Sequence, residues 1–193
     1  MKIYLLDIDQ QMIDAWKNEF SKFPEIEIVN DSFENFMDNH PDIQGVVSPA
    51  NSFGFMDGGY DKAITDYFGD IIQYKVQQIL YNNLSGYQQV GSCIAVSIDD
   101  DITLLHVPTM RIPQKITDPR IIFDCTINCM SIAKSIGLDA IVIPAFGACT
   151  GQVPKDIVAK LMSFAYEVTL NPIMSIEHAY NINIRLNKIC EGE

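Results

Sequence analysis

The segment SPANSFGFMDGGYD, residues 48 to 61, is the most informative part of the sequence for the fold class. It follows the short apolar run IQGVVS, which is typical of a buried strand, and it leads into the helix-like segment DKAITDYF. Gly54, Gly58 and Gly59 lack a Cβ atom, so the backbone can bend sharply here and approach a ligand closely. The same glycines would also serve a plain strand-to-helix connection. A buried strand, a glycine-rich turn and a helix in this order predict an α/β domain.

A second stretch has the same arrangement. AIVIPA, residues 140 to 145, is read as a buried strand, and the small-residue loop FGACTGQV leads to a helix from Pro154 to about Leu170. In α/β sheets, ligands bind beyond the carboxyl ends of the strands, and the N–H groups at helix starts bind anions. Two such loops could therefore hold both sides of one diphosphate. Neither loop contains a GxGxxG or a GxxxxGK[ST] pattern.

The rest of the chain alternates expected strands with expected helices. Strands are expected at residues 2–8, 25–30, 44–48, 92–98 and 102–107, and helices at 10–23, 61–84 with a break at Gly69, and 118–136. NINIRL, residues 181 to 186, is read as a further strand. The alternation predicts a three-layer α/β/α fold with a central mixed, largely parallel sheet, formed by residues 1–193 as a single domain.

Composition narrows the classes of partner. A net charge of -12 argues against a nucleic-acid groove and against an anionic membrane surface. No apolar run reaches the roughly 18 residues of a membrane span, and the opening MKIYLLDID lacks the features of a signal peptide. The five cysteines form no CxxC pair and have no adjacent histidine, which argues against zinc. We therefore expect a cytoplasmic protein without a bound metal.

The first stretch resembles the macro domain, the module that binds ADP-ribose and includes proteins that process ADP-ribose-1″-phosphate. That family has a strand ending in NAAN, a glycine-rich turn, and an aspartate that opens a helix. SPAN and SFGFMDGGYD place Asn51 on the second Asn of the motif and Asp61 on its Asp, ten residues later. EIEIVNDS resembles the strand that ends in Gly-Asp-Ile, so Asp31 matches the acid that binds the adenine amino group. With LLHVPTMRIP, residues 104 to 113, the combination most resembles a bacterial and phage branch.

The resemblance implies that the partner is ADP-ribose or an ADP-ribosylated macromolecule, and that no cofactor is needed. Asn51 and Asp61 would lie near the distal ribose and would orient or activate a water there. Each also has a structural interpretation: the Asn amide can bond the backbone of its turn, and the Asp can interact with the helix dipole. The ligand-binding positions that the resemblance implies are Asp31, Ser32, Ser48, Ala50, Gly58, Gly59, Tyr60, Phe146, Gly147, Ala148, Cys149, Thr150 and Gly151.

The second loop departs from the family's Pro-Ala-Ile-Ser-Thr-Gly-aliphatic-aromatic pattern. A gapless alignment places Ala148, Cys149 and Gly151 at the positions of the Thr, the Gly and the aromatic residue, whereas a shifted register places Thr150 and Gly151 on the Thr-Gly pair. In the first loop, Asp57 interrupts a turn that is often all glycine, and a carboxylate beside a diphosphate repels it unless it points to solvent.

Three functions follow from these residues. The protein could hydrolyse ADP-ribosyl linkages or process an ADP-ribose derivative through Asn51 and Asp61. It could read ADP-ribose or a related nucleotide without turnover, as the altered second loop suggests. It could also be a phage-derived structural protein that kept the fold and lost the activity. His106 is read as a core histidine rather than a general base, and Cys149 as a small residue rather than a nucleophile.

Overall fold

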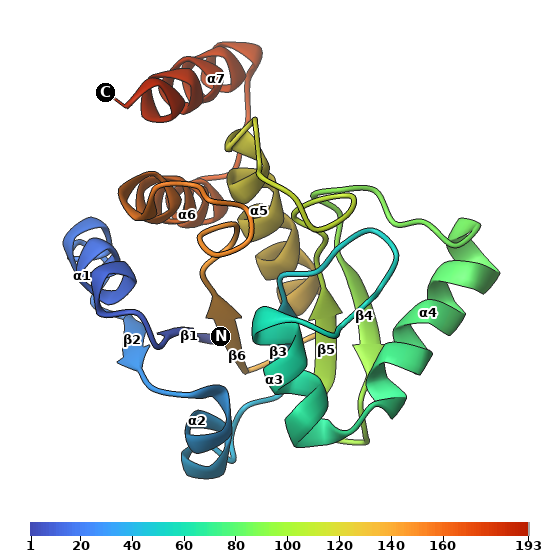
Figure 1. Ribbon diagram of the computed structural model, residues 1–193. Coiled ribbons are helices and arrows are strands. Elements are labelled where there is room, and N and C mark those ends of the chain that lie inside the picture. The colour runs from blue at the N-terminus through green and yellow to red at the C-terminus, as the bar shows by residue number, and fades with distance from the viewer. Residues whose placement is uncertain (193) are drawn as a thin grey trace.

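The computed structural model describes residues 1–192 and is built around one mixed sheet (Figure 1). The strands lie in the order β2-β1-β6-β3-β5-β4, and every neighbouring pair is parallel except β4 and β5. The sheet of the described residues consists of β1 (Lys2–Asp7), β2 (Ile26–Asn30), β3 (Gly45–Ser48), β4 (Ile94–Ser97), β5 (Thr103–His106) and β6 (Ala140–Pro144). The predicted mixed, largely parallel sheet is confirmed.

Helices cover both faces of this sheet, which confirms the three-layer arrangement (Figure 1). One face carries α1, α5 and α6, and the other carries α2, α3 and α4, while α7 lies outside α5 and α6. The helices of residues 1–192 are α1 (Gln10–Glu19), α2 (Phe33–Asn39), α3 (Gly59–Phe68), α4 (Ile71–Leu84), α5 (Arg120–Ser135), α6 (Lys155–Leu170) and α7 (Ile176–Glu191). That residues 1–193 form a single domain stays a prediction, and residue 193 lies outside the described residues.

Strand β1 shows why the chain forms a sheet with two cores. Ile3 and Leu5 pack into the core under α1, α5 and α6, whereas Tyr4 and Leu6 pack into the core under α2, α3 and α4. All four side chains are buried. Because successive side chains of a strand point to opposite faces, an uninterrupted apolar run fits only a strand that is covered on both sides.

Two helices differ from the sequence prediction. The predicted strand at residues 181–186 is wrong, because this segment lies inside α7. Its buried residues are Ile182, Leu186 and Ile189, and their spacings of four and three are those of a helix face. The alternation of isoleucine with asparagine gave a misleading strand pattern. Helix α2 was not predicted; it begins after Ser32, whose hydroxyl accepts a 3.2 Å hydrogen bond from the backbone N–H of Asn35.

The break predicted inside residues 61–84 is confirmed, since α3 ends before Gly69, which has a φ of 93°. The parallel strands β2, β1, β6, β3 and β5 all end at the same edge of the sheet. The segments that follow these strands include both glycine-rich loops, so the fold brings the predicted site residues to one edge.

Candidate functional site

A cavity of about 560 Å³ lies at the carboxyl ends of the parallel strands. Its walls come from the ends of β1 and β2, from both glycine-rich loops, from the start of α3, and from the loop after β5. The lining residues are 6–8, 31–33, 49–51, 55, 57–61, 63, 109, 110, 113, 144, 145 and 147–151. This volume is within the usual range for small-molecule sites.

The structure brings nearly all of the predicted site residues to this cavity. Asn51, Asp61 and Asp31 line it, together with the predicted residues of both loops. Two predicted residues lie behind the wall instead. Ser48 is buried and is bonded to Asp61, and Phe146 is buried in the core under α1, α5 and α6. These two side chains support the site from below and do not line the cavity.

Asp61 is a buried carboxyl in the first turn of α3, and only 7% of it is exposed. The hydroxyl of Ser48 donates a 2.7 Å hydrogen bond to its Oδ1 atom. Burial raises the pKa of Asp61 to about 7; the Ser48 hydrogen bond acts in the opposite direction, and the charge of Asp57 adds to the increase. Near neutral pH this group can therefore either accept or donate a proton, as a general base or acid requires.

Asn51 uses its side chain to close the turn that follows β3. Its Nδ2 donates to the carbonyl of Phe55 at 2.7 Å, and its Oδ1 accepts from the N–H groups of Phe53 at 3.1 Å and Phe55 at 3.4 Å. The structural interpretation of Asn51 is thus realised. A primary amide has two N–H donors, so one of them remains for a ligand.

The start of α3 lines the cavity. Gly58 precedes the helix and provides no side-chain cap, and Gly59 has a φ of +56°. A Cβ atom at either glycine would meet no other atom within 4 Å, so the space above this turn is open. Uncapped N–H groups at a helix start form a site suited to an anion.

The second loop is closed around two glycines. Gly147 has a φ of +73°, and its carbonyl accepts a 3.1 Å hydrogen bond from the N–H of Val153. A Cβ atom at Gly151 would lie 2.6 Å from that carbonyl oxygen and 2.6 Å from the Cδ1 atom of Ile116. An aromatic side chain therefore cannot occupy position 151 in this loop, where the gapless alignment places the aromatic residue of the family pattern.

The wall of the cavity is acidic. Asp7, Asp31, Asp57 and Asp61 line it, and no lysine or arginine is among the lining residues in the described part of the chain. Burial raises the pKa of Asp7, although the N–H of Asp9 donates to its Oδ1 at 2.8 Å. Asp57 is exposed and also lines the cavity, so its charge lies on the cavity wall. An anion in this cavity would have to be held by backbone N–H groups.

Tyr60 has a buried hydroxyl whose pKa is influenced by two of these carboxyls. Within residues 1–192 the hydroxyl has no hydrogen-bond partner. Burial raises its pKa well above the usual value, and the charges of Asp7 and Asp61 contribute. The hydroxyl therefore stays protonated and carries a hydrogen that the surrounding protein does not accept.

His106 and Cys149 were the two other reactive side chains considered from the sequence. His106 is fully buried, its Nδ1 lies 2.7 Å from Oε1 of Gln88, and burial lowers its pKa to about 3. A neutral core histidine is confirmed. Cys149 is exposed and lines the cavity, whereas Cys125 and Cys129 are buried in the core.

Two parts of the wall were not predicted from the sequence. Asp7 ends β1 and Ile8 follows it, and Thr109, Met110 and Pro113 follow β5. The available signal was the rule that ligands lie beyond the carboxyl ends of parallel strands, which applies to β1 and β5 as well as to β3 and β6. Among residues 1–192 there is no group of three or more His, Cys, Asp or Glu side chains suited to a metal ion. None of the helices in that range has the length and apolar character that a membrane crossing requires.

Comparison with known proteins agrees with this geometry. A macrodomain of Oceanobacillus iheyensis, solved with ADP, has a TM-score of 0.57 and 18% identity, over 79% of this chain and 87% of that one. The macrodomain of Mycobacterium tuberculosis DarG has a TM-score of 0.57 and 14% identity, over 66% and 84%. A macrodomain of Trypanosoma brucei in complex with ADP-ribose has a TM-score of 0.53 and 17% identity, over 67% and 53%. At these identities the structures are alike in fold. The family model of the Macro domain matches residues 47–162, more than half of the chain, so this protein belongs to the macro domain family.

Proposed function

We propose that the cavity binds ADP-ribose. The observation that carries this proposal is that Asp31, the start of α3 and both glycine-rich loops enclose one cavity of about 560 Å³ in a chain of the macro domain family. The T. brucei macrodomain was solved in complex with ADP-ribose, and its similar fold supports the same ligand here. Uncapped N–H groups explain how an acidic protein can bind a diphosphate.

The order of the strands suggests how the ligand lies. Asp31 follows β2 near one end of the sheet, and Asn51 follows β3, which is separated from β2 by β1 and β6. The adenine would contact Asp31, because a carboxylate accepts hydrogen bonds from an amino group. The diphosphate would lie between the start of α3 and the second loop. The distal ribose would then reach Asn51 and Asp61.

We further propose that the protein hydrolyses a bond at the anomeric carbon of the distal ribose. Asp61 would accept a proton from a water, whose oxygen forms a bond to that carbon while the bond to the acceptor breaks. The acceptor leaves with the electron pair of that bond and takes up a proton. A carboxyl with a pKa of about 7 is suited to this transfer at neutral pH. Asn51 would hold the turn that positions the ribose.

Calorimetric titration with ADP-ribose tests the binding proposal, with AMP and ATP as competing ligands. We expect selective binding that weakens when Asp31 is replaced by Ala. Alkylation of Cys149 gives a second readout, because this thiol is exposed on the cavity wall and a bound ligand should protect it. The absence of both binding heat and protection would contradict the proposal.

Release of ADP-ribose from modified protein or nucleic acid tests the hydrolytic proposal separately. Asp61→Asn should abolish release while ligand binding persists, whereas Asp57→Asn should retain release because Asp57 is exposed. Turnover by Asp61→Asn equal to that of the parent protein would contradict the role of Asp61.

A non-catalytic reader is the second candidate function. Two observations favour it: the Asn51 amide is largely occupied by its own turn, and Gly151 leaves no room for an aromatic side chain in the second loop. A reader would bind ADP-ribose tightly and release none from any modified acceptor. The same binding and release measurements therefore distinguish the two functions.

A further inference from the structure

Helix α7 has two apolar faces on opposite sides. The inner face consists of Ile182, Leu186 and Ile189, which are buried in the core under α1, α5 and α6. The helix lies outside α5 and α6 and contacts both, at the periphery of the molecule (Figure 1). The macro domain match ends at residue 162, before α7 begins.

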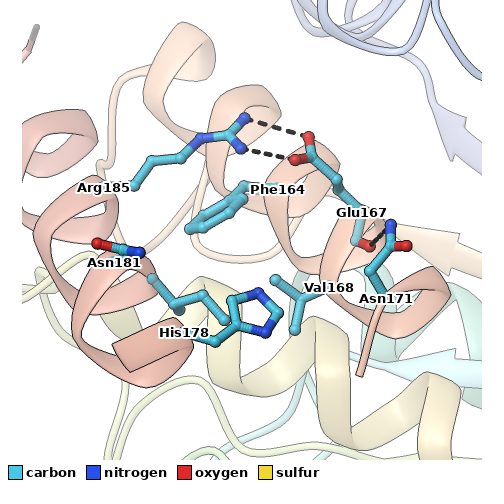
Figure 2. Close-up of a pocket in the computed structure, with 8 residues that line it drawn as sticks. Phe164, Glu167, Val168, Asn171, His178, Asn181 and Arg185 are labelled. Atoms are coloured by element: carbon cyan, nitrogen blue, oxygen red, sulfur yellow. Dashed lines mark hydrogen bonds and ion pairs between the residues drawn. The ribbon is translucent and has the colours of Figure 1, made fainter. Parts of the chain in front are cut away.

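A polar anchor fixes the orientation of α7 on α6. Figure 2 shows Arg185 of α7 directed toward Glu167 of α6, with donor–acceptor distances of 2.7 and 3.2 Å. The guanidinium also lies over the ring of Phe164, 4.0 Å from its centroid. A forked ion pair combined with stacking on an aromatic ring holds the arginine in one geometry. The small cavity beside it, about 150 Å³, is part of this packing seam.

The outer face of α7 consists of Ile176, Tyr180 and Ile184, spaced by four residues and exposed. Tyr180 is 65% exposed. Exposed large apolar side chains also occur just before the helix, at Leu170, Ile173 and Met174. A stripe of this kind on a helix face is typical of a helix that packs against another helix.

The region around α7 carries no net charge. From residue 170 to residue 192, Arg185 and Lys188 balance Glu177 and Glu191, whereas the chain as a whole carries -12. Two copies that approach through strongly acidic parts of the surface would repel each other. The three residues that form the outer face of α7 are uncharged, so this repulsion does not oppose contact there. The net negative charge of the chain disfavours binding to an anionic membrane.

We propose that the outer face of α7 pairs with the same face of a second copy of this chain, in an antiparallel helix pair. An isologous contact needs a self-complementary surface. A two-fold axis between Tyr180 and Ile184 would place each of these side chains against the other residue in the partner copy. The same axis places Glu177 opposite Lys188 of the second copy, on one flank of the stripe.

The available apolar area is sufficient for such a contact. The three side chains of the outer face and the three exposed apolar side chains before the helix make six in each copy. At on the order of 100 Å² each, they would bury about 1,200 Å² in total, which is the lower end for a specific interface. Asn183 and Asn187 lie between the apolar residues along the helix and add uncharged polar groups. The contact therefore has an apolar centre with polar surroundings.

Light scattering after gel filtration, or sedimentation velocity, tests the proposal on the full chain. The parent protein should have twice the chain mass of 21.7 kDa and should dissociate on dilution. Tyr180→Glu and Ile184→Glu should yield monomers. Tyr81→Glu is the matched control, since Tyr81 is a 79% exposed tyrosine on α4. Circular dichroism establishes that each variant is folded.

Charge exchange tests the antiparallel geometry. Glu177→Lys and Lys188→Glu should each weaken the dimer, and the double variant should restore it. A monomeric parent protein at all concentrations would overturn the proposal, and so would a dimer that persists in both Tyr180→Glu and Ile184→Glu. Equal dissociation by Tyr81→Glu and Tyr180→Glu would overturn it as well, because the interface would then not be specific to α7.

Discussion

Ser48 and Asp61 are thirteen positions apart in the sequence, and the hydroxyl of Ser48 donates a 2.7 Å hydrogen bond to Oδ1 of Asp61. The bond joins the end of β3 to the first turn of α3, beneath the cavity wall. Both residues are buried, and the hydrogen bond opposes the cost of ionising Asp61 in this environment.

Replacing Asp61 by Asn should change how stability depends on pH. Burial raises the folded-state pKa from 3.8 to about 7, so between these values the folded state holds a proton that the unfolded state has lost. Stability should therefore fall as pH rises through this range, by on the order of a few kcal/mol. Asp61→Asn removes the titration and should be more stable than the parent at high pH, with the difference vanishing near pH ~4. Urea unfolding at several pH values measures this, and parallel pH curves for the two proteins would contradict it.

Ser48→Ala should destabilise the protein most when Asp61 is ionised. The variant leaves a buried carboxylate without its hydroxyl donor, at a cost of about 1–3 kcal/mol at high pH. At low pH Asp61 is protonated and the loss should be smaller. Because the hydrogen bond lowers the pKa of Asp61, the variant should move its titration to higher pH. A carboxyl titration followed by NMR, with Ser48→Thr as the variant that keeps a hydroxyl, checks the shift.

Affinity for ADP-ribose should increase as pH falls from about 8 to about 6, because protonation removes the Asp61 charge near an anionic ligand. The effect should be several-fold. It should disappear in Asp61→Asn, and it should persist in Asp57→Asn, since Asp57 contributes only a secondary part of the Asp61 shift. Calorimetry at the two pH values measures the difference. Affinity that is independent of pH in the parent protein would show that the ligand does not lie beside Asp61.

Gly151→Ala should open the second loop and weaken ligand binding at least about tenfold. The Cβ atom of the alanine would lie 2.6 Å from the carbonyl oxygen of Gly147. Backbone atoms cannot shift locally, so the loop as a whole would have to move. Gly45→Ala is the control outside the cavity, where a Cβ would lie 2.7 Å from side-chain atoms of Ile141 and Leu138. Calorimetry and thermal unfolding of both variants test this. Equal affinity in the two variants would contradict the steric argument.

Asn51→Ala should loosen the turn from residue 51 to residue 55, since it removes the hydrogen bonds to Phe53 and Phe55. The loss should be about 1–3 kcal/mol in unfolding free energy, with faster amide exchange at Phe53 and Phe55. Asn82→Ala is a suitable control, because Asn82 is an exposed asparagine of α4 outside the cavity. Unchanged exchange at Phe55 would mean that the turn does not depend on Asn51.

The amino-acid sequence was sufficient to predict the fold class and to locate the two glycine-rich loops. Short apolar runs followed by glycine-rich turns specify buried parallel strands that end at a ligand-binding edge, and the ten-residue spacing from Asn51 to Asp61 indicated the family. These features are local in the chain, so they can be read without coordinates. The prediction failed for α7, where an alternating pattern concealed a helical one until packing on α5 and α6 showed which residues are buried.

The state of the site depends on contacts that form when the chain folds. The pKa of Asp61 depends on burial and on Ser48, the contribution of Asp7 depends on β1 lying next to β6, and the exclusion of an aromatic at Gly151 depends on Ile116 and Gly147. Desolvation and steric contact are properties of the assembled core, made by residues that are distant in the chain. For this reason the position of the site could be predicted from the sequence, whereas its protonation and its shape depend on how the folded chain packs. The same packing leaves one apolar face of α7 exposed.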